Sequence, residues 1–341
     1  MSFHSVPGSD PIDTLNILKD SVLVLPTISI GNTPQLAVDL LIYNLNLKLV
    51  GRLDDTYLYP FVSPVDCAID ANIDSNNFIQ EKENQENGIL SSLELYYGED
   101  LKISVLQQRS PILPGYQNMF LTELILPFIH NVGFSKVIIL NSEDFGLQLN
   151  NEKKFQIYYD DDNLNDFFKK LSIDDEEIEN DFTKNNNINN FNIIKEVNEK
   201  NHSKFINGFV KIVSNNKDLS LQKFKPTQIE KEATTAANNL TKFLSANSTN
   251  APEDTTIETK NTNNYSINLI ILSIFVYEGD NSHDAKLLDL KFFKIFKLLN
   301  TSNPKILQFL ENINLNKIPK SWLGVYGNKP LPVGYEDGLY A

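Results

Sequence analysis

The polar groups best placed for chemistry follow an apolar run at residues 267–276. The sequence EGDNSH at residues 278–283 comes almost directly after that run. Open α/β sheets bind ligands at the carboxyl ends of their strands, so Glu278 or Asp280 could act as a general base with His283 nearby. Alternatively, the next helix is capped by Asp280, Asn281 or Ser282, and the carboxylates favour its positive end. We favour capping, because no second catalytic group stands at a telling spacing.

Other motifs indicate chemistry more weakly. The stretch SIGNTPQ has one glycine before a helix start but neither phosphate-loop pattern, and turn and N-cap roles account for Gly31, Thr33 and Pro34. The sequence also lacks the GxSxG motif of a serine nucleophile. Residues 160–162 are aspartates without EF-hand spacing, and no metal-ligand spacing joins the histidines, which are His4, His130, His202 and His283. We therefore expect no metal and no cofactor.

The elements that would position these residues alternate between strands and helices. Residues 22–30 form a β-branched apolar run that Gly31 and Asn32 interrupt, and a helix is expected from Thr33 to about Leu45. Further strands are expected at 47–53, 136–140 and 267–276, and the runs 91–97 and 102–108 flank a polar turn as a hairpin.

Two more helices are expected. Pro127 should kink or shorten the helix over residues 115–130. The other helix follows residue 282, and its side chains available for burial are Leu287, Leu290, Phe293 and Ile295. Together the elements predict an α/β fold with a layered, largely parallel central sheet flanked by helices, an antiparallel hairpin and long polar insertions.

The domain organisation follows from composition. We expect a flexible N-terminal tail at 1–20 and a single α/β domain made of residues 21–171, 205–213 and 265–333. The tracts 172–204 and 214–264 are rich in polar residues, cannot bury enough apolar surface to offset their ordering entropy, and are predicted to be disordered insertions. Residues 334–341 are expected to be a flexible C-terminal tail.

Charge and cysteine content limit the partners and the compartment. The chain has 44 acidic and 30 basic residues and a net charge of −14, which disfavours nucleic acid and anionic membrane surfaces. Cys67 is its only cysteine, so an intrachain disulfide cannot form. No signal-peptide pattern or membrane-length apolar run is present. We expect a soluble protein of the cytoplasm and also of the nucleus.

Five blocks resemble the proteasome assembly chaperone 2 family in the same order. They are VLPTISIGNTPQLAVDLLI, YLYPFVSPVD, SSLELYYGEDLKISVLQQRSPI, FVYEGDNSHDA and PKSWLGVYG. The resemblance implies a fold similar to that of nucleoside-phosphorylase-like proteins without their chemistry. It also implies a heterodimer with proteasome assembly chaperone 1 that holds the alpha ring of the 20S core particle during assembly.

The chain ends in Leu339, Tyr340 and Ala341, which fit the hydrophobic-Tyr-X (HbYX) tail of that family. In proteasome activators such a tail enters a pocket between adjacent alpha subunits. Leu339 can bury an apolar side chain, Tyr340 supplies a ring and a hydroxyl, and the terminal carboxylate suits a pocket lysine or backbone amides. The competing hypothesis is an α/β hydrolase or phosphorylase-type enzyme that uses Glu278 and Asp280.

Overall fold

The computed structural model describes residues 3–70, 88–147, 154–159, 191–194, 204–215, 268–311, 313, 315–323 and 325–326. The chain divides into two compact units, residues 1–211 with 267–341 and residues 212–266. The main strands of the first unit are β1 (Phe3–Ser5), β2 (Val22–Pro26), β3 (Lys48–Leu53), β7 (Leu93–Gly98), β8 (Ile103–Gln108), β9 (Lys136–Asp144), β10 (Phe155–Tyr159), β11 (Phe191–Ile194) and β12 (Leu269–Val276).

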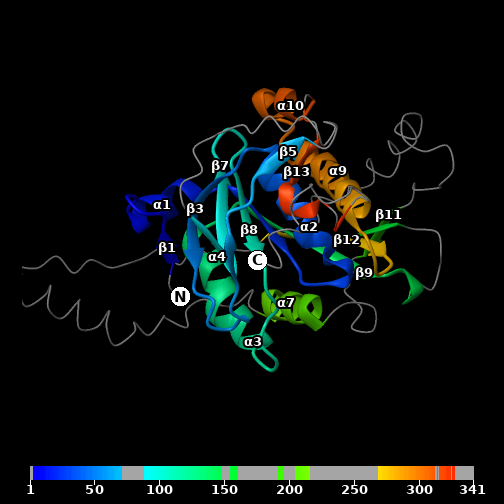
Figure 1. Cartoon of the computed structure of the whole chain (residues 1–341), viewed down its shortest axis with the longest axis horizontal. Helices are drawn as coiled ribbons and strands as arrows, with labels where there is room; N and C mark the ends of the chain where they lie inside the picture. The colour runs from blue at the N-terminus through cyan, green and yellow to red at the C-terminus, as the bar shows by residue number, and fades with distance from the viewer. Residues whose placement is uncertain are drawn as a thin grey trace, which may run out of the picture. The chain divides into compact units, whose positions relative to one another are not determined.

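These nine strands form one mixed sheet in the order β1-β3-β7-β8-β2-β9-β12-β10-β11 (Figure 1). Its centre, β8-β2-β9-β12, is parallel, whereas β1, β3 and β7 continue it with antiparallel pairs. The predicted α/β fold and the hairpin, seen as β7 and β8, are therefore confirmed. Segments from both halves of the chain share the sheet, because β12 pairs with β9 over its full length.

Two two-stranded sheets are separate from the large sheet. β4 (Val62–Pro64) pairs with β6 (Ile89–Ser91), and β5 (Ala68–Asp70) pairs with β13 (Lys317–Pro319). Both pairs are antiparallel. The second pair joins segments far apart in sequence and becomes important below.

The helices cover both faces of the large sheet. They are α1 (Pro11–Leu18), α2 (Thr33–Asn44), α3 (Gln117–Met119), α4 (Leu126–Val132), α7 (Lys204–Asn215), α9 (Ser282–Leu299) and α10 (Pro304–Glu311). Helices α2 and α9 pack together on one face, where Leu40 and Phe292 join the core with Val24 and Ile138 (Figure 1). Helix α4 connects β8 to β9, and its buried Phe128 does not belong to that core, which indicates that α4 lies on the opposite face.

Pro127 changes the helix around it as expected, though by a different route from a simple kink. A π-helix over Phe120–Ile125 lies between α3 and α4, and the proline is the second residue of α4. Proline has no N–H and its ring crowds the carbonyl four residues earlier, so a wider turn accommodates it. The residues on either side remain helical and their apolar side chains stay buried.

The prediction of a flexible tail at residues 1–20 is wrong for the segment Phe3–Leu18. β1 pairs with β3, and the Phe3 ring lies so close to Gly51 that a Cβ atom there would be 2.4 Å from it. Asp10 caps α1 by accepting hydrogen bonds from the amides of Ile12 (2.8 Å) and Asp13 (3.1 Å). A polar composition concealed a short edge strand and a capped helix.

Three smaller expectations also need correction. The predicted insertion 172–204 contains β11, a short strand that pairs with β10. It was not predicted because the polar residues around it dominate the composition of that tract. Thr33 does not cap α2: Asn32 is the N-cap, and the Thr33 hydroxyl donates to the carbonyl of Ile30. Leu290, which was expected to be available for burial, is 47% exposed. The predicted insertion 214–264 lies outside the described residues beyond residue 215.

Candidate functional site

The predicted binding residues Leu339, Tyr340 and Ala341 lie outside the described residues, whose last member is Tyr326. The structure does describe how the segment that leads toward them is attached. β13 pairs with β5 in the register Ile318 opposite Ile69. We call this attachment the anchor, and it comprises Asn44 and residues 66–70, 317–323, 325 and 326.

Asn44 holds the start of the anchor with a reciprocal pair of hydrogen bonds. Its Nδ2 donates to the carbonyl of Lys317 at 2.7 Å, and its Oδ1 accepts from the amide of Lys317 at 2.9 Å. The same Nδ2 also donates to the carbonyl of Leu40, which orients the side chain at the end of α2. Because an amide side chain carries both a donor and an acceptor, one residue satisfies both backbone groups of Lys317.

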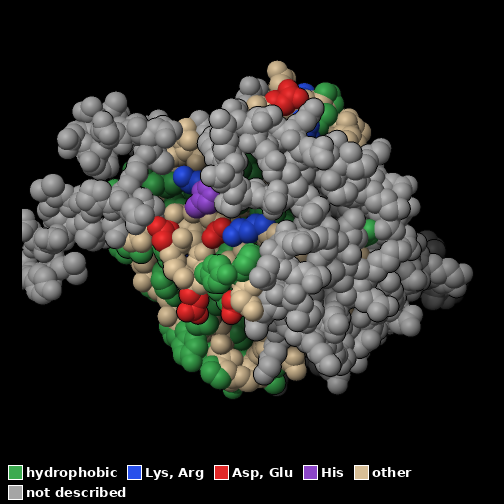
Figure 2. Space-filling view, turned by 90° about the vertical axis from the view of Figure 1, so that its right-hand side faces the viewer, with side chains coloured by type: hydrophobic (Ala, Val, Ile, Leu, Met, Phe, Trp, Pro, Cys, Tyr) green, Lys and Arg blue, Asp and Glu red, His purple; other side chains and the backbone are tan. Residues whose placement is uncertain are grey.

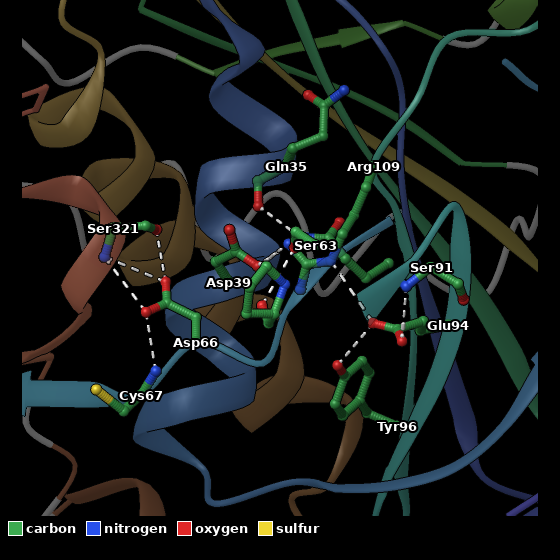
Figure 3. A network of polar contacts seen from close by, with 12 residues as sticks. Gln35, Asp39, Ser63, Asp66, Cys67, Ser91, Glu94, Tyr96, Arg109 and Ser321 are labelled. Carbon is green, nitrogen blue, oxygen red and sulfur yellow. Dashed lines mark hydrogen bonds and ion pairs between the residues drawn. The ribbon is translucent and has the colours of Figure 1, made fainter. Parts of the chain in front are cut away.

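Asp66 holds the middle of the anchor (Figure 3). Its Oδ2 accepts from the hydroxyl (2.5 Å) and the amide (3.2 Å) of Ser321, and its Oδ1 accepts from the amide of Cys67 (2.8 Å). Hydrogen bonds to a carboxylate are roughly twice as strong as those between neutral groups. Asp66 therefore ties residue 321 to the strand that begins at residue 68.

An aromatic residue completes the anchor. Trp322 is only 3% exposed and belongs to the core formed by α2, α9 and the sheet. Tyr326 meets its ring edge to face at 5.4 Å and donates its amide to the Trp322 carbonyl. Burial of a side chain this large makes Trp322 the main apolar contribution to the anchor.

A buried ion network lies next to the anchor (Figure 3). The Glu94 carboxylate is fully buried and lies 3.4 Å from Arg52 and 3.6 Å from Arg109. Arg109 in turn lies 3.2 Å from Asp39 on α2. Two guanidinium groups thus face two carboxyl groups, which joins β3, β7 and the end of β8 to α2. The hydroxyl of Tyr96 also donates to Glu94 at 3.0 Å.

Burial governs the protonation of this network. It raises the pKa of the Asp39 carboxyl in spite of the nearby Arg109 guanidinium. Burial lowers the pKa of Arg109, but Asp39, Tyr96 and Glu94 outweigh it, so that the pKa of Arg109 is raised. Burial beside Glu94 likewise raises the pKa of the Tyr96 phenol. Arg109 consequently keeps its positive charge, and its role here is to hold strands and helix together.

The enzyme hypothesis depends on Glu278, Asp280 and His283, which the structure places on the surface beyond β12. Asp280 accepts a hydrogen bond from the amide of Ser282 at 3.0 Å. That is the helix-start role favoured above, although Asn281, the N-cap residue, makes no side-chain capping bond. Asn281 is buried instead against Gly31, so the structure brings the SIGNTPQ turn and the EGDN segment together.

Buried polar side chains lie near those segments at the ends of β2, β9 and β12. Asn141 accepts from the hydroxyl of Thr27 (2.8 Å) and donates to Ser273 (3.0 Å) and to Glu143 (3.1 Å). The hydroxyls of Ser29 and Ser142 lie 2.7 Å apart. These groups satisfy one another, and among the residues that the structure describes no cluster of His, Cys, Asp and Glu could hold a metal ion.

The described surface mixes charge types. On the face shown in Figure 2, acidic side chains lie scattered among apolar and uncharged groups, and one of them lies directly beside a basic side chain. None of the described helices has both the length and the apolarity needed to cross a membrane.

Sequence reasoning missed the anchor and the ion network. The only hint of the anchor in the sequence is that two polar residues, Asn44 and Asp66, stand next to apolar segments. The sequence does not indicate that both contact residues 317–321. Their partners stand more than 250 positions away in the chain: the contacts of Asn44 span 273 residues, and those of Asp66 span 255.

Comparison with known sequences gives consistent matches. A model described as the PAC2 family matches residues 23–207. Proteasome assembly chaperone 2 of Saccharomyces cerevisiae is 34% identical over 125 residues, which cover 36% of this chain and 45% of that protein. The protein of the same name from Danio rerio is 32% identical over 130 residues, which cover 38% and 45%. The matches thus span less than half the length of these relatives.

Solved structures with similar folds include two archaeal proteins from Pyrococcus furiosus. PbaA, described as an archaeal homologue of proteasome-assembly chaperone, aligns with a TM-score of 0.46 and 13% identity over 86% of this chain and 88% of that chain. PbaB, described as an archaeal proteasome activator, gives a TM-score of 0.44 and 11% identity over 91% and 98%.

Proposed function

This chain belongs to the PAC2 family, and from that premise we propose that it is a proteasome assembly chaperone that acts by binding. The observation that carries the proposal is the run of curated relatives named proteasome assembly chaperone 2, from yeast to vertebrates, at about a third identity. An anchored chain segment that leads to the HbYX residues supports a binding role.

The proposal includes two partners. The chain forms a heterodimer with proteasome assembly chaperone 1, and the pair binds the alpha ring of the 20S core particle while it assembles. Leu339, Tyr340 and Ala341 enter a pocket of the ring, and no cofactor takes part. The proposed location is the cytoplasm and also the nucleus.

The anchor gives the proposed tail a fixed origin. Leu339 follows Tyr326 by 13 positions, so it can lie at most about 45 Å from the anchor. Leu339 contributes roughly 1.5–3 kcal/mol when fully buried, but ordering the tail opposes this gain. A single tail therefore binds weakly, and a second contact in the same complex raises its effective concentration.

Deletion of Leu339 to Ala341 tests this proposal. The shortened chain is expected to fold and to form the heterodimer normally, while its affinity for purified 20S core particle falls. Amidation of the terminal carboxylate should weaken binding in the same direction, because it removes the anion. Equal affinity of the intact and shortened chains would refute the tail, and recovery from lysate without chaperone 1 or alpha subunits would refute the assembly role.

The same deletion separates binding from catalysis. A hydrolase or phosphorylase-type enzyme that uses Glu278 and Asp280 would keep its activity after loss of three terminal residues. The complementary variant replaces Glu278 and Asp280 by Gln and Asn. If the chain is a chaperone, this variant should still associate with the alpha ring.

A further inference from the structure

In the part of the chain that the structure describes, exposed apolar side chains occur on and next to β4 and β6. Val62 and Ile89 are 69% and 54% exposed, and Tyr59 and Val65 are 44% and 41% exposed. In the pairing of β4 with β6, Pro64 stands opposite Ile89 and two residues from Val62, so these three side chains share the outward face. We call the surface made by Val62, Pro64 and Ile89, with Tyr59 and Val65 flanking β4 in the sequence, the β4–β6 face.

The β4–β6 face is suited to contact with a protein. Neither residues 56–65 nor residues 88–93 contain a charged side chain, although the chain as a whole is strongly acidic. The exposed parts of its large side chains amount to on the order of 300 Å² of apolar surface, which is in the range of functional patches on monomers.

Hydrogen bonds from neighbouring side chains hold the backbone of the β4–β6 face in place. The Nη2 of Arg52 donates to the carbonyl of Ile89 at 2.8 Å, and Glu94 accepts from the amide of Ser91 at 3.1 Å. The hydroxyl of Ser92 donates to the carbonyl of Tyr59 at 3.3 Å. The buried ion network thus fixes the backbone of an apolar surface, which reduces the entropy lost when a partner binds.

The face adjoins the anchor. Val65 follows Pro64 of β4 and directly precedes Asp66, which holds Ser321. We propose that the β4–β6 face is a second contact with the alpha ring, made beside the origin of the tail. This inference rests on the proposed function and adds to it a surface of the globular body.

Area favours the ring over the sister chaperone as the occupant. An obligate dimer interface buries roughly 1,000–2,500 Å² on each partner and is largely apolar. The β4–β6 face supplies only about a third or less of the lower figure. It is large enough to reinforce a weakly bound tail of a chain that is already nearby, because the two contacts act as one bivalent engagement.

The test uses the full chain in its heterodimer and purified 20S core particle. The double variant Val62→Lys/Ile89→Lys adds two charges to the face, and lysine is well tolerated on edge strands. The matched control is Ile12→Lys/Ile17→Lys on α1, where the side chains are 69% and 52% exposed. Both variants change the net charge equally, and thermal unfolding checks that each is folded.

We expect the Val62→Lys/Ile89→Lys variant to bind the core particle about ten-fold more weakly than the control variant. In chains that lack Leu339 to Ala341, the same substitutions should further reduce the residual binding. Equal affinity of the two variants, with tail deletion still harmful, overturns the inference and leaves the proposed function standing. Loss of the heterodimer in the Val62→Lys/Ile89→Lys variant also overturns it, because the sister chaperone would then be the occupant. No effect of the tail deletion refutes the proposed function itself.

Discussion

Replacement of Asn44 by alanine should release the anchor without unfolding the domain. The substitution removes two hydrogen bonds, of 2.7 Å and 2.9 Å, that satisfy both backbone groups of Lys317. Each contributes roughly 0.5–1.5 kcal/mol net, so the anchor should lose about 1–3 kcal/mol. The population of the detached state then rises by between about five- and 150-fold.

Trp322 provides the assay because it is the only tryptophan of the chain and is buried in the anchor. In the Asn44→Ala variant we expect its fluorescence to shift to the red and to be quenched more readily by an added solute. Amide exchange at Ile318 should accelerate, since that residue pairs with Ile69 only while the anchor is closed. The far-ultraviolet circular dichroism should barely change.

The matched control is Lys317→Met, which removes only the exposed bond from Lys317 Nζ to Asn46 and keeps both backbone bonds. An exposed contact of this kind contributes less than about 1 kcal/mol, so the control should resemble the natural chain. If Asn44→Ala left both the fluorescence and the amide exchange unchanged, the anchor would be held by Trp322 packing alone and the reasoning would fail.

Three other predictions concern the fold around the site. Glu94→Gln should destabilise the domain by about 3–5 kcal/mol in urea unfolding, because it leaves Arg109 buried with one carboxyl partner fewer; a loss below about 1 kcal/mol would contradict that role. Burial raises the pKa of Asp289 well above its usual value, so the folded state binds the proton more tightly and the free energy of unfolding falls as pH rises above about 4. The Asp289→Asn variant should show a flatter profile in unfolding measured from pH 4 to 8, and an unchanged slope would exclude Asp289 as the source. Gly31→Ala should lower the melting temperature, since Gly31 has φ of 63° and a Cβ there would lie 1.9 Å from Asn281 Nδ2; an unchanged melting temperature would show that Asn281 moves aside freely.

Local patterns predicted the regular elements well. The alternating runs around Gly98 gave the hairpin of β7 and β8, and the continuous apolar run after residue 268 gave β12, which is buried on both faces. Where local composition misled, as at β1, α1 and β11, the cause was shortness: β1 has three residues, β11 four and α1 eight, and elements this short do not stand out from polar surroundings.

By itself the sequence determined the periodic elements, the acidic and cysteine-poor character of the chain, and the blocks that place it in its family, because each depends on residues adjacent in the chain. Only the tertiary structure decided that Asn44 and Asp66 hold residues 317–321, and that Glu94 meets both Arg52 and Arg109. Those contacts depend on which strands become neighbours, and side-chain hydrogen bonds have no periodicity that a sequence could display. The exposed apolar face of β4 and β6 also became visible only in the tertiary structure, because the sequence does not show whether an apolar side chain is buried or exposed.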